Sequence, residues 1–254
     1  MLERVILITG ARSGIGAALA RRLAAPGVGL MLHTRGIDNG HLADLERVAD
    51  EVRAAGAQVA TGIIDLAVDG AGERLVAATA AQFGRLDHLV SNAGFARRGG
   101  FGAVDRAVLE YSHRAMTGAF FDLATAALAE LRRGGCGRVV AVSSFVAHHF
   151  DPGTPFPVSA AAKAGLEALV RSLAAQLAGD GVTVNAVVPG YTRKDAAGHS
   201  ALSAGAWQRA AALTPLGRIA EPDEVAALIA FLLSAEARHI TGQAIHVDGG
   251  LSLL

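Results

Sequence analysis

The sequence predicts an α/β fold built on one doubly wound parallel sheet, with helices covering both faces. Short β-rich runs alternate with amphipathic stretches at helical spacing along the whole chain. The runs are apolar throughout rather than alternating, which indicates strands buried on both faces. No linker, repeat or low-complexity tract interrupts the pattern. We therefore expect residues 1–254 to form one domain.

Seven runs have the composition of strands, and most end at Gly, Pro or polar turn residues. They are residues 4–9, 30–34, 59–64, 86–91, 138–144, 182–188 and 243–247. Apolar residues at helical spacing predict helices between and after them. These are residues 15–24, 41–55, 72–83, 103–133 in two pieces, 158–178 and 222–233.

Composition limits the function. The formal net charge is zero, so no overall field favours nucleic acid or an anionic membrane surface. The single cysteine, Cys136, excludes an internal disulfide and a cysteine-cluster zinc site, and we expect no metal. The apolar run at 5–8 is too short to span a membrane and precedes no cleavage site. We expect a soluble, cytoplasmic protein with no membrane partner.

A glycine-rich turn joins the first expected strand to the first expected helix. Residues 9–16 read Thr-Gly-Ala-Arg-Ser-Gly-Ile-Gly. Glycine permits the sharp turn and a close approach to a pyrophosphate, and the helix N-terminus offers free N–H groups to the anion. No Lys-Ser/Thr follows, so the turn is not a phosphate-loop NTPase motif. The turn predicts a dinucleotide site formed by Gly10, Arg12, Ser13, Gly14, Ile15 and Gly16.

With the motifs that follow it, this turn resembles the short-chain dehydrogenase/reductase family over nearly the whole chain, and the C-terminal part is similar to β-ketoacyl carrier-protein reductases. The resemblance implies a Rossmann-type fold. The matching segments are the glycine turn, Asp65-Leu66, Ser91-Asn92-Ala93-Gly94, Val142-Ser143-Ser144, Lys163, Pro189-Gly190, Gly217-Arg218, Thr241-Gly242-Gln243 and Val247-Asp248-Gly249-Gly250.

The resemblance also implies roles for single positions. Ser144 and Lys163 fall on active-site positions, and Lys163 would also contact the cofactor ribose. Residues 195–213 are expected to form a substrate lid. A homotetramer or homodimer is expected through helices at 115–133 and 158–178. Further cofactor contacts are implied for Asp65, Leu66, Asn92, Ala93, Gly94, Pro189, Gly190 and Thr192.

The residues after the second expected strand bear on cofactor preference. NAD-preferring folds usually place an acid there, whereas this strand ends His33-Thr34-Arg35, and arginine suits the 2′-phosphate of NADP. Arg12 adds a second positive charge. NADP(H) is therefore favoured. NAD(H) stays open, because both arginines could be solvated and Asp38 could serve as the NAD-type acid.

Two active-site positions depart from the family. The resemblance implies a proton-exchanging tyrosine four residues before the lysine, and Ser159 stands there. Ala115 stands where the family usually has asparagine. An aliphatic hydroxyl is a much weaker acid than a phenol, and it is a ring's length shorter. The candidate replacements are His148, His149, Tyr191 and a water held by Ser159, whereas Tyr111 is expected to be packing or surface.

We predict an NADP(H)-dependent oxidoreductase that transfers hydride between nicotinamide and a carbonyl or secondary alcohol, with Ser144, Ser159 and Lys163 in an atypical proton relay. The alternative is a cofactor-binding, catalytically weak or inactive member that acts as a sensor or partner subunit. A third hypothesis is non-redox chemistry with a histidine base. Phe95, Tyr191, Trp207 and residues 148–150 favour an apolar cleft with little fixed positive charge, and so a small apolar substrate.

Overall fold

The centre of the molecule is a seven-stranded sheet. The computed structural model describes residues 2–36, 38–193 and 204–253. The strand order is β3-β2-β1-β4-β5-β6-β7, and every neighbouring pair is parallel. The strands are β1 Arg4–Ile8, β2 Val28–Thr34, β3 Gln58–Ile63, β4 His88–Ser91, β5 Arg138–Val142, β6 Thr183–Pro189 and β7 Ala244–Val247. The predicted fold class is confirmed.

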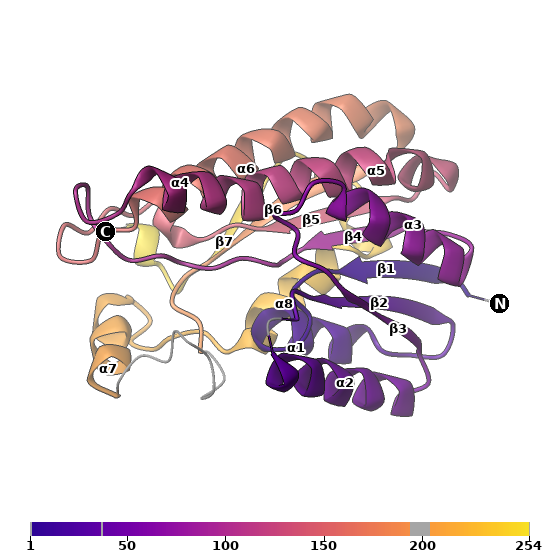
Figure 1. Cartoon of the computed structure of the whole chain (residues 1–254), viewed down its shortest axis with the longest axis horizontal. Coiled ribbons are helices and arrows are strands. Elements are labelled where there is room, and N and C mark those ends of the chain that lie inside the picture. Colours follow the sequence, from indigo (N-terminus) through magenta and orange to yellow (C-terminus); the bar gives the residue numbers. More distant parts are fainter. Residues whose placement is uncertain (1, 37, 194–203, 254) are drawn as a thin grey trace.

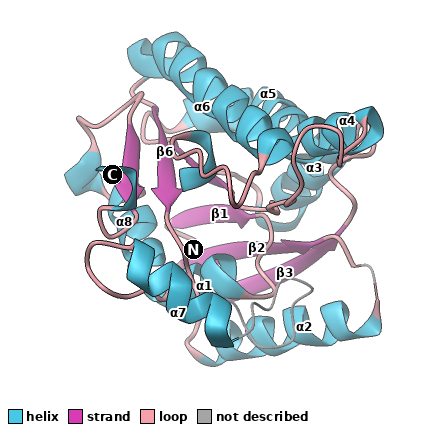
Figure 2. Ribbon diagram, turned by 90° about the vertical axis from the view of Figure 1, so that its left-hand side faces the viewer, coloured by secondary structure: helices cyan, strands magenta, loops and turns pink. Residues whose placement is uncertain are grey.

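Helices cover both faces of this sheet (Figures 1 and 2). One face carries α1 Gly14–Leu23, α2 Asn39–Ala54 and α8 Pro222–Leu232. The other carries α3 Ala71–Phe83, α5 Ala119–Arg133 and α6 Pro157–Leu177. Helix α4 Arg106–Ser112 precedes α5, and α7 Ala204–Leu213 lies apart from both layers in Figure 1. No helix among the described residues is long and apolar enough to cross a bilayer.

Alternating strand residues supply the two cores. Ile6 and Ile8 of β1 pack in the cluster with α1 and α8, whereas Val5 and Leu7 pack in the cluster with α3, α5 and α6. All four are fully buried. Full burial of one such side chain contributes about 1.5–3 kcal/mol to the stability of the fold. Because both faces of the strand are covered by helices, every residue along the strand can make this contribution, which explains the uniformly apolar runs.

Two expected elements differ in detail. The strand expected at 138–144 ends at Val142, which leaves Ser144 in the following loop. The helix expected at 103–133 is interrupted by a π-helical segment at His113–Gly118, a device often found beside functional sites. The lid expected at 195–213 falls partly outside the described residues, since its last part forms α7 and residues 195–203 are not described.

The strand order determines where a ligand-binding crevice can form. Successive strands run outward from β1 to β3, and the chain then returns to place β4 on the other side of β1. The loops that follow β1 and β4 therefore diverge at the carboxyl edge of the sheet, where open α/β sheets bind their ligands.

Candidate functional site

A cavity of about 820 Å³ lies at this carboxyl edge. Its walls come from the loops after β1, β2, β3, β4, β5 and β6, together with Lys163 of α6. Of the predicted site residues, all but Gly16 and Ser159 line it: Gly10, Arg12, Ser13, Gly14, Ile15, Arg35, Asp65, Leu66, Asn92, Ala93, Gly94, Ser144, Lys163, Pro189, Gly190 and Thr192.

The glycine turn is shaped by backbone geometry. Gly10 and Gly14 have φ of +67° and +55°, values that a side chain rarely permits. A Cβ on Gly16 would collide with the carbonyl oxygen of Gly10, so this glycine supports the turn from behind rather than lining the cavity. The three glycines thus hold a turn with an open anion-facing side.

The turn is locked to the loop after β4. The Asn92 Nδ2 donates to the carbonyl oxygens of Thr9 and Gly10 at 2.9 and 3.1 Å. The Thr9 Oγ1 in turn accepts from the backbone N–H groups of Asn92 and Ala93, both at 3.0 Å. The cavity floor is therefore fixed by bonds within the chain.

His33, which the sequence did not single out, braces the turn from the second strand. Its Nε2 lies 2.8 Å from the carbonyl oxygen of Ile64, and its Nδ1 accepts from the backbone N–H of Gly10 at 3.4 Å. Burial lowers the pKa of His33, which favours the neutral ring that can donate at one nitrogen and accept at the other.

Two arginines stand at one end of the cavity. The Arg12 Nη1 pairs with the Asp44 carboxylate at 3.2 Å, and the Arg35 Nη1 donates to the Tyr111 hydroxyl at 2.5 Å. His41 lines the same end, and its buried Nδ1 has no hydrogen-bond partner among the described residues. Burial, and then the positive charge of Arg12, lower the pKa of His41.

Two residues at this end differ in part from the expectation. Tyr111 packs on Phe95, with ring centroids 5.8 Å apart, but it also lines the cavity, which was not expected. Asp38 does not line the cavity. Its Oδ1 accepts the backbone N–H of His41 at 2.9 Å and caps α2.

The opposite end brings Lys163, Ser144 and Ala115 to one wall. The Lys163 Nζ donates to the carbonyl oxygen of Val142 at 2.6 Å, and the residue is only 5% exposed. Burial lowers the pKa of Lys163 to about 8, against the opposing effect of the Glu167 carboxylate one turn along α6. The Ser144 Oγ accepts from the backbone N–H of Val146 at 3.4 Å.

Ser159 does not reach the cavity. It is fully buried, and its Oγ accepts the backbone N–H of Arg97 at 2.8 Å. The Ser159 hydroxyl thus holds the loop after β4 in place. The structure brings together Ser144 and Lys163 of the predicted trio, and it leaves the serine at the tyrosine position behind the wall.

Of the candidate replacement groups, only Tyr191 lines the cavity. The His148 Nε2 lies 2.9 Å from the Oε1 of Glu167, and His149 packs beside Phe145. Tyr191 packs against Phe145 at 4.6 Å between centroids, and burial raises its pKa. Glu167, buried and also accepting from Ser143, was not predicted because it occupies an ordinary helical position.

The wall beyond Lys163 is aromatic, and the cavity lining also contains Arg98 and Arg193, the latter paired with Glu221. The aromatic lining of this wall consists of Phe145, Phe156, Tyr191 and Trp207. The Arg98 guanidinium also lines the cavity and lies 5.7 Å from the Phe156 ring centroid. Phe95, Tyr191 and Trp207 line the cavity as expected, whereas residues 148–150 do not. The expectation of little fixed positive charge is wrong at Arg98.

Known proteins are similar to this chain in sequence and in fold. A family model described as "Enoyl-(Acyl carrier protein) reductase" matches residues 10–252. The chain is 34% identical over 259 residues to an L-rhamnose 1-dehydrogenase (NAD(P)(+)) of Azotobacter vinelandii, covering 99% of this chain and 97% of that protein. The chain belongs to the short-chain dehydrogenase/reductase family.

Other members of the family show how widely its chemistry ranges. The chain is 33% identical to the 3-oxoacyl-(acyl-carrier-protein) reductase FabG of Escherichia coli over 251 residues, covering 99% of this chain and 98% of that protein. A short-chain dehydrogenase from Burkholderia cenocepacia, solved in complex with NADP, superposes with a TM-score of 0.87 at 31% identity and covers 98% of each chain. These relatives establish an oxidoreductase family with a nicotinamide cofactor site, and they differ in substrate.

Proposed function

We propose that this short-chain dehydrogenase/reductase transfers hydride between NADP(H) and a carbonyl or secondary alcohol, with a proton relay that lacks the family tyrosine. One observation carries the proposal. Lys163 and Ser144 stand on the wall of the same cavity whose other end is the glycine turn. A dinucleotide on the turn would therefore reach the two polar groups of the reaction end.

The residues present fit a dinucleotide. A Cβ on Gly14 would meet no atom within 4 Å, so the turn has an open side where an anion could lie. Gly10 and Gly190 instead let neighbouring loops pack closely, since a Cβ on Gly10 would lie 2.9 Å from the Cα of Ala93 and one on Gly190 would lie 2.7 Å from the Cα of Asp248. The turn would hold the pyrophosphate, Asp65 and Leu66 the adenine, and Lys163 the ribose. The adjoining wall, formed by Pro189, Gly190 and Thr192, would hold the nicotinamide, which supplies or accepts the hydride when bound.

The chain's own groups would manage the substrate oxygen. The Ser144 hydroxyl can donate a hydrogen bond to it, and the Lys163 ammonium stabilises negative charge that develops there. Tyr191 is the replacement proton donor that the cavity supports best. Its phenol is protonated at neutral pH and has a proton to donate, although burial raises its pKa and so makes it a weaker acid. The aromatic lining fits a small apolar ketone or alcohol, and Arg98 would favour one that carries an anionic group.

Steady-state assays with NADPH over a panel of ketones, and with NADP over the matching alcohols, test the proposal. We expect slow but measurable turnover. Tight NADPH binding without turnover on any substrate would instead support the alternative function, a cofactor-binding sensor or partner subunit. No binding of either nicotinamide would contradict both.

Arg35→Ala is expected to raise the Kd for NADPH by about 10- to 100-fold, because a charged hydrogen bond contributes roughly 1.5–3 kcal/mol. The Kd for NADH should change little, since NADH has no 2′-phosphate. Fluorescence titration of both cofactors provides the measurement. Tyr111→Phe is the matched control, because it removes the partner of Arg35 but keeps the charge. An equal loss for both cofactors would show that Arg35 does not read the phosphate.

We propose that the protein assembles as a homotetramer. A homodimer is the alternative assembly. Helix α5 exposes Phe121, which is 56% accessible in the single chain. Its exposure fits a helix face that a second copy would cover. Size-exclusion chromatography with light scattering should give four times the chain mass, and a monomer would contradict the proposal.

A further inference from the structure

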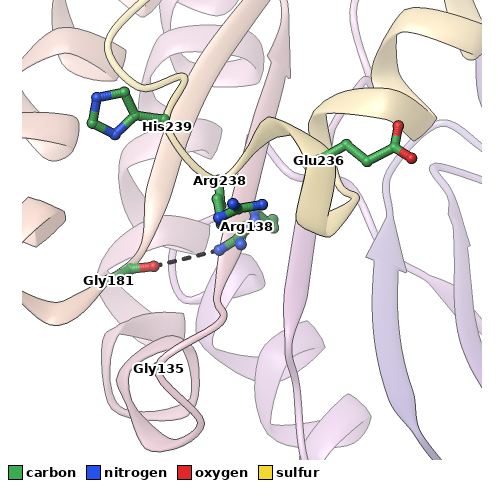
Figure 3. Close-up of a pocket in the computed structure, with 6 residues that line it drawn as sticks. All are labelled: Gly135, Arg138, Gly181, Glu236, Arg238 and His239. Carbon is green, nitrogen blue, oxygen red and sulfur yellow. Dashed lines mark hydrogen bonds between the residues drawn. The ribbon is translucent and has the colours of Figure 1, made fainter.

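A second cavity lies at the opposite edge of the sheet from the cavity beside the glycine turn, which is called the cofactor cavity below. Its volume is about 560 Å³, and it opens beside the amino ends of β5 and β6. Figure 3 shows its lining, which is Gly135, Arg138, Gly181, Glu236, Arg238 and His239. None of these residues lines the cofactor cavity.

Arg138, the first residue of β5, is buried without an acidic partner. It is 6% exposed. Its Nη1 donates only to backbone carbonyls among the described residues, to Gly137 at 2.8 Å and Gly181 at 3.4 Å. Its Nε is buried with no partner in the same part of the chain. Burial lowers the pKa of Arg138, but a guanidinium stays charged in proteins, so an unpaired buried charge results.

The two residues that lie beside Arg138 on the neighbouring strands also have buried polar atoms without hydrogen-bond partners among the described residues. His88 on β4 and Thr183 on β6 are the register partners of Arg138, and both are buried. The Nδ1 of His88 and the Oγ1 of Thr183 also have no hydrogen-bond partner among the described residues. Burial lowers the pKa of His88 to about 4, so it adds hydrogen-bonding capacity and no charge at neutral pH. Unsatisfied buried groups are uncommon, and here three lie in one row.

The cavity also has an excess of positive charge. Arg238 shares it, with its Nη1 donating to the carbonyl oxygen of Ala235 at 3.2 Å. The Glu236 carboxylate points away from both guanidinium groups in Figure 3. Two acids near this edge are already paired, Asp87 with Arg85 at 2.6 Å and Asp180 with Arg132 at 2.7 Å. Two guanidinium groups thus share one cavity, and no acid among the described residues pairs with either.

We propose that this cavity binds a compact oxyanion with two negative charges, namely phosphate or the phosphate group of a larger molecule. The guanidinium groups of Arg138 and Arg238 would contact its oxygens, because planar guanidinium donors match phosphate geometry. The bound anion would relieve the unpaired charge. Since the site lies across the sheet from the reaction end, its occupation would act on stability rather than on hydride transfer.

Thermal unfolding tests the proposal, with inorganic phosphate as the probe and chloride holding the ionic strength constant. A ligand that binds only the folded state raises Tm, and we expect a rise of about 2–4 °C in the wild type. Arg238→Gln should abolish the rise, and because Arg238 is exposed this variant should fold. Arg138→Gln should abolish it as well.

Two matched variants exclude other sources of the effect. Arg12→Gln removes a charge from the cofactor cavity, and Arg171→Gln removes an exposed charge from α6. Both should keep the full rise. The proposal is overturned if phosphate does not raise Tm, if Arg238→Gln keeps the rise, or if Arg12→Gln alone removes it. A parallel series with a phosphate monoester distinguishes the sources: an equal rise indicates that phosphorylated molecules bind, and a rise with inorganic phosphate alone indicates the free ion.

Discussion

Replacing Ser159 with tyrosine is expected to raise kcat for ketone reduction by about 10²–10⁴-fold, the usual contribution of a positioned proton donor. Ser159 precedes Lys163 by one helical turn on α6, so the two side chains leave the same face of the helix. The serine hydroxyl stops behind the cavity wall. A tyrosine ring is long enough to carry a hydroxyl past that wall, toward Lys163 and Ser144.

The ring has to displace the hydrogen bond from the Arg97 N–H to the Ser159 Oγ and the part of the wall that covers this fully buried residue. This bond ties down an exposed residue of the loop after β4, so its loss should loosen the loop without unfolding the sheet. The measurement is kcat under saturating NADPH, with the Kd for NADPH determined in parallel. Ser159→Phe, which adds the ring without the hydroxyl, should show no gain.

Tyr191→Phe gives the complementary test. If Tyr191 is the proton donor, Tyr191→Phe lowers kcat in the otherwise wild-type protein. In a protein that also carries Ser159→Tyr, the same change should have little effect on kcat. A Ser159→Tyr variant that binds NADPH with unchanged affinity but keeps the wild-type kcat would show that the missing phenol does not limit the rate.

The sequence predicted the sheet and a set of residues that do line one cavity, because both depend on local patterns. Uniformly apolar runs mark strands buried on two faces, and the spacing of Gly10, Gly14 and Gly16 follows from the turn itself. Lys163 and Ser144 were found by motif, and the structure brings them to one wall.

Residues whose partners lie far along the chain could not be assigned in this way. Tyr111 was expected to be packing or surface, but it bonds to Arg35, 76 positions away. The same limit applies to Ser159, since sequence shows that the phenol is missing but not that the N–H of Arg97 occupies the hydroxyl. His33 sits inside an apolar strand, and only the neighbouring strands reveal what its two nitrogens bind.

Lys163→Met is expected to abolish turnover and to stabilise the protein at the same time. Loss of turnover follows from removing the ammonium at the reaction end. Stabilisation follows because Lys163 is buried without an ion pair among the described residues, and its Nζ donates to a single carbonyl, that of Val142. The lowering of the Lys163 pKa from 10.5 to about 8 corresponds to a cost of about 3 kcal/mol for burying its charge, which an apolar side chain of similar length does not carry.

The pH dependence of stability identifies this charge as the cause. The pKa of Lys163 falls from 10.5 to about 8 on folding. Below pH 8 the lysine is protonated in both states, so the full cost of burying its charge is present. Between about pH 8 and 10.5 the unfolded state binds more protons, and wild-type stability contributed by this group rises with pH. The advantage of Lys163→Met should therefore be constant below about pH 8 and shrink above it.

Denaturant unfolding of both proteins across this pH range, followed at equilibrium, measures the effect. Arg171→Met on the same helix is the control, since it removes an exposed charge and should alter neither stability nor turnover appreciably. A Lys163→Met protein that is less stable than the wild type at neutral pH would show that the bond to Val142 outweighs the cost of burial. A Lys163→Met variant that is more stable than the wild type but inactive is the expected result. It would show that Lys163 serves the reaction at a cost to the stability of the protein.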